Sequence, residues 1–194
     1  LGKVLTDAGI DPTIIIGSTA GFLGNQNYRK GDSEWFLLEA CEYHQGFLHY
    51  NPEITCITNI EHDHFDAYPT QEDYLNAFQE LLDKSNKVIL NTDLPMSSLL
   101  EADATTFKGG DKKFDLVLPG AHNQSNAMAA YLTAKELGVD DETIAKSLAD
   151  FEGTGRRMEI VKEADGKIYM DDYGHHPTEI KAVLSALKEQ YPEK

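Results

Sequence analysis

Four short runs of apolar residues constrain the fold of this chain more than any other feature. They occupy residues 13–16, 35–38, 54–58 and 87–91, and apolar residues within each run are nearly continuous. A strand with one solvated face alternates apolar and polar residues, whereas a parallel strand covered on both faces does not. The runs therefore predict an α/β fold whose mostly parallel sheet is flanked by helices.

Helical patterns accompany these runs. Thr70 and Asp73 form a capping-box pattern, and a helical apolar face follows it. Further helices are predicted over about 124–137, after Asp140, and from Pro177 onward. The members of the first apolar face are Tyr74, Ala77, Phe78, Leu81 and Leu82.

Other segments are less regular. Residues 17–32 are rich in Gly and Asn and are predicted to form a loop. Residues 92–113 are polar and carry no assignable pattern, whereas apolar and polar residues alternate in 114–118. Residues 168–170 are predicted to form a strand. The Gly- and Arg-containing segment 153–157 interrupts the helical pattern and predicts a hinge between two domains. We expect a central domain over 1–157 and the start of a second domain over 158–194.

The composition excludes several classes of protein. Acidic residues outnumber basic ones by 33 to 17, giving a formal charge of −16, so an extended nucleic-acid-binding face is not expected. No stretch is long and apolar enough to span a membrane, and no secretory signal is evident. The two cysteines are predicted to be buried, unpaired thiols in a reducing cytoplasm. The first residue, Leu1, suggests that the parent protein begins upstream.

Three clusters of ionisable side chains follow predicted strands. They occupy residues 39–42, 61–66 and 171–176. Because the carboxyl ends of parallel strands meet at the ligand-binding edge of an α/β sheet, we expect the clusters to share one site. The middle cluster contains two histidines and three carboxylates, so it is the strongest candidate for metal binding or proton transfer.

A second hypothesis for the middle cluster is a hydrolytic metal site. His62, His64 and Asp66 match the H-x-H-x-D spacing of binuclear hydrolases of the metallo-β-lactamase type, and imidazoles suit zinc. That pattern continues with another histidine, where this chain has Ala67. Its fold is also built from mostly antiparallel sheets, so this hypothesis ranks second.

Polar residues elsewhere suggest nucleotide contacts. His122, Asn123 and Asn126 lie at a predicted helix start, where they would either cap the helix or bind a base. The adjacent residues Arg156 and Arg157 would either be solvated or clamp a phosphate. Asp172 could likewise accept hydrogen bonds from ribose hydroxyls.

Taken together, five motifs resemble the Mur ligase family. The resemblance covers nearly the whole chain in the expected order, and the last motif is the most specific. It implies a central ATPase domain followed by the first βα unit of a Rossmann-like C-terminal domain. The motifs are E-A-C-E from Glu39, T-N-I-E-H-D-H-F-D from Thr58, P-G-A-H-N-Q-S-N-A from Pro119, G-R-R from Gly155 and D-D-Y-G-H-H-P-T-E from Asp171.

The resemblance implies an ATP-dependent carboxylate–amine ligase of bacterial peptidoglycan synthesis, working in the cytoplasm with Mg²⁺. Its closest match is to the member that joins L-alanine to UDP-N-acetylmuramate through an acyl phosphate. The alternative is the related ligase that attaches a murein tripeptide to the same sugar nucleotide. The motif at Glu39 favours the alanine-adding member. No oligomeric state is indicated.

The same resemblance implies roles for individual residues. Glu39 and His64 resemble the Mg²⁺ ligands. His122, Asn123 and Asn126 resemble the adenine contacts, Arg156 and Arg157 the phosphate contacts, and Asp172 the ribose contact. His64, His175 and His176 resemble catalytic residues, the last two reaching the amino acid and the reacting carboxylate when the domains close.

Two departures from the family pattern bear on activity. The P-loop, G-T-H-G-K-T-T, would precede Leu1, and the segment between Asn91 and Pro119 is shorter than the family's. We therefore expect the 194-residue chain alone neither to hydrolyse ATP nor to ligate, and measurable turnover would contradict this. A third hypothesis, a noncatalytic nucleotide-binding module, would be favoured if no G-K-T loop lies upstream.

Overall fold

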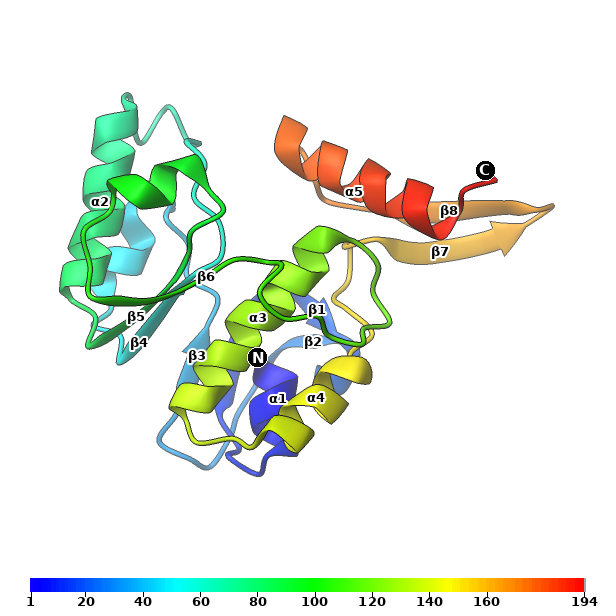
Figure 1. Cartoon of the computed structure of the whole chain (residues 1–194), viewed down its shortest axis with the longest axis horizontal. Coiled ribbons are helices and arrows are strands. Elements are labelled where there is room, and N and C mark those ends of the chain that lie inside the picture. Colours follow the sequence, from blue (N-terminus) through cyan, green and yellow to red (C-terminus); the bar gives the residue numbers. More distant parts are fainter. Residues whose placement is uncertain (194) are drawn as a thin grey trace.

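The computed structural model describes residues 1–193, apart from the side chain at position 95. The fold is α/β, with two three-stranded sheets, a two-stranded hairpin and helices packed on them (Figure 1). The helices are α1 Gly2–Asp7, α2 Gln71–Asp83, α3 Ala121–Glu136, α4 Asp141–Ala149 and α5 Pro177–Gln190. Short 3-10 turns occupy Gly21–Leu23, Tyr43–His49 and Pro95–Leu99. The strands are β1 Thr13–Ala20, β2 Gln26–Arg29, β3 Phe36–Leu38, β4 Ile54–Ile57, β5 Lys87–Asn91, β6 Ala104–Phe107, β7 Glu159–Ala164 and β8 Lys167–Asp171.

The sheet β4-β5-β6 is parallel throughout and is covered by a helix on each face. Val88 and Leu90 of β5 belong to the same apolar cluster as the buried face of α2. Ile89, between them, belongs to the cluster formed with α3. Successive strand residues point to opposite faces, so a strand covered on both sides must be apolar throughout. The predicted parallel sheet with flanking helices is confirmed.

The other three-stranded sheet has the order β2-β1-β3 and is mixed. β1 runs parallel to β3 and antiparallel to β2. Part of the predicted loop 17–32 is therefore strand, since it contains the end of β1, a 3-10 turn and β2. The sequence of β2, Gln-Asn-Tyr-Arg, is mostly exposed and lies at an edge of the sheet. A polar edge strand of this kind has no apolar pattern to reveal it.

Helix α2 begins with the predicted capping box. Thr70 Oγ1 accepts a hydrogen bond from the Asp73 backbone N–H at 3.1 Å, and Asp73 Oδ2 accepts one from the Thr70 N–H at 3.1 Å. We expect Thr70→Ala to lower the free energy of unfolding by about 1 kcal/mol, because the Asp73 N–H at the start of the helix loses its acceptor. Urea unfolding measures this, and Thr70→Ser, which keeps the hydroxyl, should stay close to wild type. Equal loss in both variants would contradict the capping role.

The unassigned residues 92–113 contain a 3-10 turn and β6. The alternating residues 114–118 form no strand. Instead, the side-chain amide of Gln124 on α3 holds this segment: its Nε2 donates to the Phe114 carbonyl at 2.9 Å, and its Oε1 accepts from the Phe114 N–H at 2.9 Å. The amide supplies the pair of hydrogen bonds that a neighbouring strand would have supplied.

The segment 153–157, predicted to be a hinge, packs against the end of β1. The Gly155 N–H donates to the Thr19 carbonyl at 2.8 Å, and Ser18 Oγ donates to the Gly155 carbonyl at 2.5 Å. A Cβ at position 155 would lie 2.6 Å from Thr19 Oγ1, so glycine permits this close approach. Beyond it, β8 contains the predicted strand and leads to α5, and its antiparallel partner β7 is a further strand.

The two cysteines have different surroundings. Cys41 is exposed, which corrects the prediction that both thiols are buried, whereas burial raises the pKa of Cys56 to about 11. Only the thiolate reacts readily with alkylating agents. We expect iodoacetamide at pH 8 to label Cys41 at least tenfold faster than Cys56 in the folded protein, as measured by mass spectrometry of peptides. Comparable rates in the folded protein, with equal rates in urea as the control, would contradict this.

Candidate functional site

The loop after β4 carries the middle cluster of ionisable residues. Asp63 Oδ1 accepts a hydrogen bond from the His64 backbone N–H at 2.6 Å, and His64 has a positive φ of 54°. The His64 ring lies with Nε2 3.4 Å from Glu42 Oε1 and 3.7 Å from Asp63 Oδ2. The loop thus turns sharply at His64, and two carboxylates flank the imidazole.

The three residues of the hydrolase hypothesis have separate environments. The His62 ring packs against Phe65 and Tyr74, and its Nε2 lies 3.0 Å from the Tyr68 carbonyl oxygen. Asp66 accepts a hydrogen bond from the Tyr43 hydroxyl at 2.9 Å. Among residues 1–193, His62, His64 and Asp66 do not make up a set of converging metal ligands. The geometry therefore gives the hydrolase hypothesis no support.

Two contacts join this loop to the beginning of α5. His176 Nε2 lies 2.9 Å from Asp63 Oδ2, and Thr178 Oγ1 donates a hydrogen bond to Glu61 Oε2. These residues are more than a hundred positions apart in the sequence. The second and third predicted clusters therefore meet in space, in the region between α5 and the β4-β5-β6 sheet (Figure 1).

Asp63 remains ionised at neutral pH. Burial alone would raise its pKa, but the hydrogen bond from the His64 N–H, the contact with His176 and the charges of both imidazoles together hold the pKa of Asp63 below its usual value. An ionised carboxylate is purely a hydrogen-bond acceptor. Asp63 therefore favours a donor on Nε2 of His176 and fixes the orientation of that ring.

His175 lies beside this pair. Its ring centroid is 4.5 Å from that of His176, and its Nδ1 lies 3.2 Å from the Tyr173 carbonyl oxygen. Glu179, one turn into α5, accepts hydrogen bonds from the backbone N–H groups of His175 and His176 at 3.0 and 3.4 Å. The first turn of α5 thus holds both histidines.

Glu39 follows β3 and lies near the end of β1. Its Oε2 accepts a hydrogen bond from the Gly17 N–H at 2.9 Å, and its backbone N–H donates to the Ile15 carbonyl. Its side chain is exposed, so carboxylate lone pairs remain for a ligand. The contacts of Glu39 involve β1, whereas those of His64 involve Glu42 and Asp63, and their sharing of one ion stays a prediction.

The predicted adenine contacts lie in the first turns of α3. Burial lowers the pKa of His122, the nearby Asp172 carboxylate opposes that shift, and Arg157 adds to it, so His122 is neutral at pH 7. Asn123 Nδ2 donates to the Pro119 carbonyl at 2.7 Å, and Asn126 is exposed. Gly120 is the N-cap of α3 and no side chain caps the helix, so Asn123 does not have the capping role that the sequence also allowed; its amide nitrogen fastens the Pro119 carbonyl and its amide oxygen is left as an acceptor.

Gly120 allows α5 to approach this helix start. It has a φ of 98°, and a Cβ at this position would lie 2.8 Å from Ala186 Cβ and 2.8 Å from His122 Cε1. Ala186 on α5 is buried. A larger residue at position 120 would separate α5 from α3 and move His122.

The hinge arginines lie around one aromatic ring. The Arg156 guanidinium carbon is 4.6 Å from the centre of the Tyr173 ring, and that of Arg157 is 6.0 Å from it. Arg157 also lies 3.8 Å from Glu179. Asp172 accepts backbone hydrogen bonds from Met158 at 2.9 Å and from Gly174 at 2.7 Å. Asp172 therefore ties the chain at Met158 to the histidine-containing loop.

Four further residues shape the site: Glu42, Asp63, Tyr173 and Glu179. All lie within the motifs singled out by sequence, yet none was assigned an individual role there. For Glu179 a signal existed, because an acidic residue three positions after a helix-capping position is typical of a capping box. The pairing of Asp63 with His176 carried no such signal, since it depends on how two distant loops meet.

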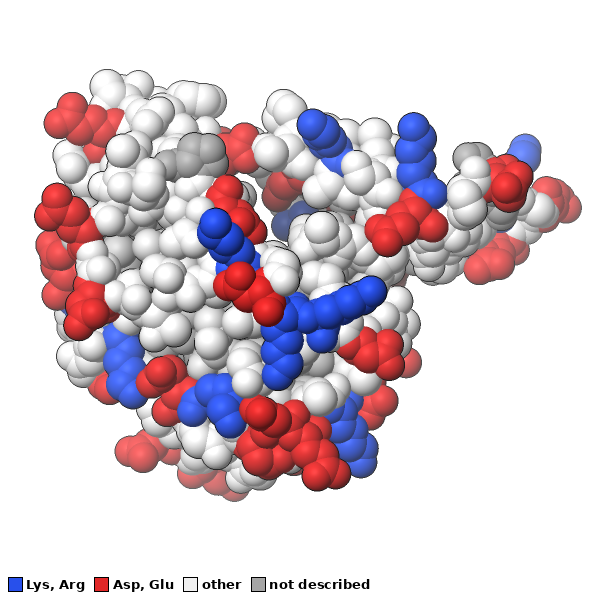
Figure 2. All heavy atoms as spheres, in the orientation of Figure 1, with Lys and Arg blue, Asp and Glu red and all other residues white. Residues whose placement is uncertain are grey.

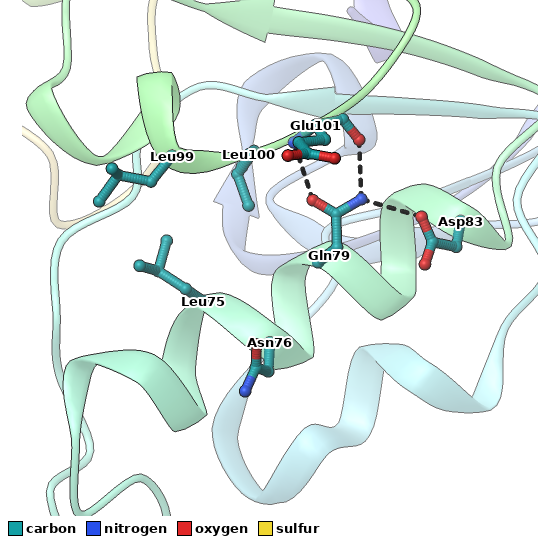
Figure 3. A pocket seen from close by; sticks show the side chains of 7 residues that line it. All are labelled: Leu75, Asn76, Gln79, Asp83, Leu99, Leu100 and Glu101. Carbon is teal, nitrogen blue, oxygen red and sulfur yellow. Dashed lines mark hydrogen bonds between the residues drawn. The ribbon is translucent and has the colours of Figure 1, made fainter.

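A pocket elsewhere has a structural explanation. It lies between α2 and the chain after the 3-10 turn Pro95–Leu99, lined by Leu75, Asn76, Gln79, Asp83, Leu99, Leu100 and Glu101 (Figure 3). The Gln79 amide donates to the Glu101 carbonyl and to Asp83 Oδ1, and it accepts from the Glu101 N–H. Its hydrogen-bonding capacity serves to fasten the chain to α2. None of the predicted site residues lines this pocket.

Charged side chains of both signs are distributed over the surface. On the face drawn in Figure 2, lysines and arginines are interspersed with acidic side chains. Within residues 1–193, no helix has the length and apolar character needed to cross a bilayer.

Comparison with known proteins gives consistent matches. Residues 25–106 match the Mur ligase middle domain, and residues 156–194 match the Mur ligase, glutamate ligase domain. The UDP-N-acetylmuramate–L-alanine ligase of Desulfitobacterium hafniense is 33% identical over all of this chain and 50% of its own length. That of Caldicellulosiruptor bescii is 36% identical over 97% of this chain and 49% of its own length. The chain thus spans about half the length of these relatives.

Solved structures have the same fold. The UDP-N-acetylmuramate–alanine ligase of Thermotoga maritima superposes with a TM-score of 0.84 at 24% identity, covering 100% of this chain and 51% of that one. A murein peptide ligase of Psychrobacter arcticus superposes with a TM-score of 0.72 at 21% identity, covering 100% and 52%. Two domain matches to one family, and similarity along the whole sequence, show that this chain belongs to the Mur ligase family.

Proposed function

We propose that the protein containing this chain is an ATP-dependent ligase that joins L-alanine to the carboxylate of UDP-N-acetylmuramate in peptidoglycan precursor synthesis. The observation that carries the proposal is the contact between His176 and Asp63. It brings the most specific family motif against the acidic loop after β4. The proposed substrates are those in the names of the relatives that are 33% and 36% identical to this chain.

The chemistry explains why these groups must converge. A carboxylate is a poor acyl donor until one oxygen becomes a leaving group, and ATP achieves this by forming an acyl phosphate. The amine then attacks, and a tetrahedral intermediate collapses to amide and phosphate. His175 and His176 would contact the amino acid and the reacting carboxylate, with Glu179 and Asp63 holding them. Ordered imidazoles are well suited to accept the proton that the amine releases.

The acidic groups near His64 require a cation if phosphates are to approach. Glu42, Asp63 and Glu61 would otherwise repel the triphosphate by like charge. Glu39 and His64 are the proposed Mg²⁺ ligands. Mg²⁺ prefers oxygen ligands and keeps several bound waters, so Glu39 is the usual kind of ligand and His64 the less usual one. A bound Mg²⁺ would neutralise phosphate charge during transfer.

The remaining proposed contacts concern the nucleotide. His122, Asn123 and Asn126 would bind adenine, and a neutral His122 offers one donor and one acceptor for this purpose. Arg156 and Arg157 would bind phosphate. Asp172 would bind ribose through the lone pairs that its two backbone hydrogen bonds leave free. We also propose that residues 1–157 and 158–194 belong to separate domains that close on the substrates, excluding water from the acyl phosphate.

Phosphate release by the full-length protein tests this proposal. With ATP and Mg²⁺ present, release should require both UDP-N-acetylmuramate and L-alanine, and mass spectrometry should detect the amide product. Release driven by a murein tripeptide instead of L-alanine would assign the alternative ligase activity. Release independent of any amine would contradict both ligase assignments.

A further inference from the structure

We propose that Asp63, His175 and His176 form a binding site for a first-row transition-metal ion such as Zn²⁺. Its ligands differ from the proposed Mg²⁺ ligands Glu39 and His64, although Asp63 Oδ2 lies 3.7 Å from His64 Nε2. Each of the three side chains offers one ligand atom, and these atoms all lie within 4.8 Å of one another. Among residues 1–193, this is the only group of three or more potential metal-binding side chains whose ligand atoms lie so close together. The site extends beyond the proposed ligase activity, and its occupancy is measurable without turnover.

The spacing suits tetrahedral coordination. Zinc bonds of about 2.0–2.2 Å place neighbouring ligand atoms roughly 3.3–3.5 Å apart. His176 Nε2 and Asp63 Oδ2 are 2.9 Å apart, so they need to separate by only a few tenths of an ångström to admit the ion. The ion would take the place of the hydrogen that Nε2 shares with Asp63 in the metal-free protein, and the ring would then carry its hydrogen on Nδ1. The two histidine rings lie side by side with centroids 4.5 Å apart, and small side-chain rotations therefore complete the arrangement.

The second nitrogen of His175 is oriented by the protein. Its Nδ1 lies 3.2 Å from the Tyr173 carbonyl oxygen, which can only accept a hydrogen bond. Nδ1 must therefore carry the hydrogen, and Nε2 keeps the lone pair that a metal needs. Glu179 Oε2, 3.8 Å from Nδ1, reinforces this tautomer. Such outer partners are a general feature of metal-binding histidines.

The donor set and its exposure favour a transition metal over Mg²⁺. Two imidazoles and one carboxylate suit Zn²⁺ and related ions, whereas Mg²⁺ prefers oxygen ligands. The side chain of His175 is 59% exposed, while those of Asp63 and His176 are 25% exposed. One side of the group is thus open to solvent, where a water can complete the coordination sphere.

The local charge also permits a cation. The start of α5 carries the positive end of the helix dipole, which opposes cation binding at His176. Three carboxylates, Asp63, Glu61 and Glu179, lie within the same network of contacts and oppose it, with Arg157, 3.8 Å from Glu179, offsetting part of their charge. A bound ion would connect the loop after β4 to the start of α5 and would occupy both histidines, so zinc is expected to inhibit ligation.

Titration of the full-length protein with Zn²⁺ by calorimetry, without substrates and with excess Mg²⁺, tests the site. We expect binding that His175→Ala and Asp63→Asn each weaken by about tenfold or more, because each removes one of three ligands. His49→Ala, which removes an exposed histidine outside the group, should bind Zn²⁺ as the wild type does. Co²⁺ should give the intense visible absorption of a four-coordinate site, and both substitutions should abolish it.

Far-UV circular dichroism and unfolding without metal show whether each variant is folded. Because the His175 side chain is mostly exposed, His175→Ala is expected to fold as the wild type does. Zinc affinity that is equal in His175→Ala, Asp63→Asn and wild type would overturn the proposal. Failure of Zn²⁺ to bind in the presence of the excess Mg²⁺ would overturn it too, because it would indicate an oxygen-ligand site.

Discussion

Replacing His176 with alanine in the full-length protein is expected to lower kcat for L-alanine-dependent phosphate release by a hundredfold or more. A positioned imidazole that moves a proton in the transition state contributes about 10²–10⁴-fold to the rate. His176 is held by two independent features, the contact with Asp63 and the Glu179 carboxylate at its backbone N–H. Steady-state kinetics at saturating substrates measure the change.

The matched control is His49→Ala. His49 is exposed near the end of the 3-10 turn Tyr43–His49 and is assigned no role in the site, so its loss should leave kcat close to wild type. If His176→Ala changes only KM for one substrate and leaves kcat intact, the ring serves binding alone. That result would contradict its proposed part in the reaction.

Replacing Phe107 with alanine is expected to lower the free energy of unfolding by about 3–5 kcal/mol, the usual cost of deleting a buried aromatic ring. Phe107 ends β6, is 1% exposed, and belongs to the apolar cluster that includes buried residues of α3. Its loss would leave a cavity between the parallel sheet and the helix that carries His122. Urea-induced unfolding, followed by circular dichroism, measures the effect.

Val117→Ala provides the comparison for this substitution. Val117 is 63% exposed, so its truncation removes little buried surface and should change stability by less than about 0.5 kcal/mol. A loss of less than 1 kcal/mol for Phe107→Ala would mean that β6 and α3 do not pack as described.

The parts of the fold that follow from sequence are those whose burial determines their composition. β4 and β5 are apolar on both faces because α2 and α3 cover them, and that pattern is visible without a structure. The start of α2 is equally visible, since Thr70 and Asp73 satisfy helix-end N–H groups through local contacts. In such cases the interacting partners are near in sequence or the environment is uniform.

Other elements were not predicted, because solvent covers them or because a side chain takes the place of a neighbouring strand. β2 and β7 are largely exposed and are defined by backbone pairing with β1 and β8. Residues 114–118 carry an alternating pattern, but the amide of Gln124 takes the hydrogen bonds of Phe114. Neither kind of interaction leaves a periodic trace in the sequence.

Some residues of the candidate site were likewise predictable from the sequence, and others were not. The motifs themselves identified the loops, including His64, His175 and His176. The importance of Asp63 and Glu179 emerged only from the meeting of the β4 loop with α5. Metal binding by Glu39 and His64, and nucleotide binding by His122, Arg157 and Asp172, depend on ligands and stay predictions.

The convergence of these two distant segments is tested most directly by a double-mutant cycle on Asp63→Asn and His176→Ala, with kcat/KM of the full-length protein as the readout. If the two side chains work as one unit, the double variant should be no slower than the slower single variant, because breaking the pair once removes the shared contribution. Losses that simply multiply would mean that Asp63 and His176 act separately and would contradict the account.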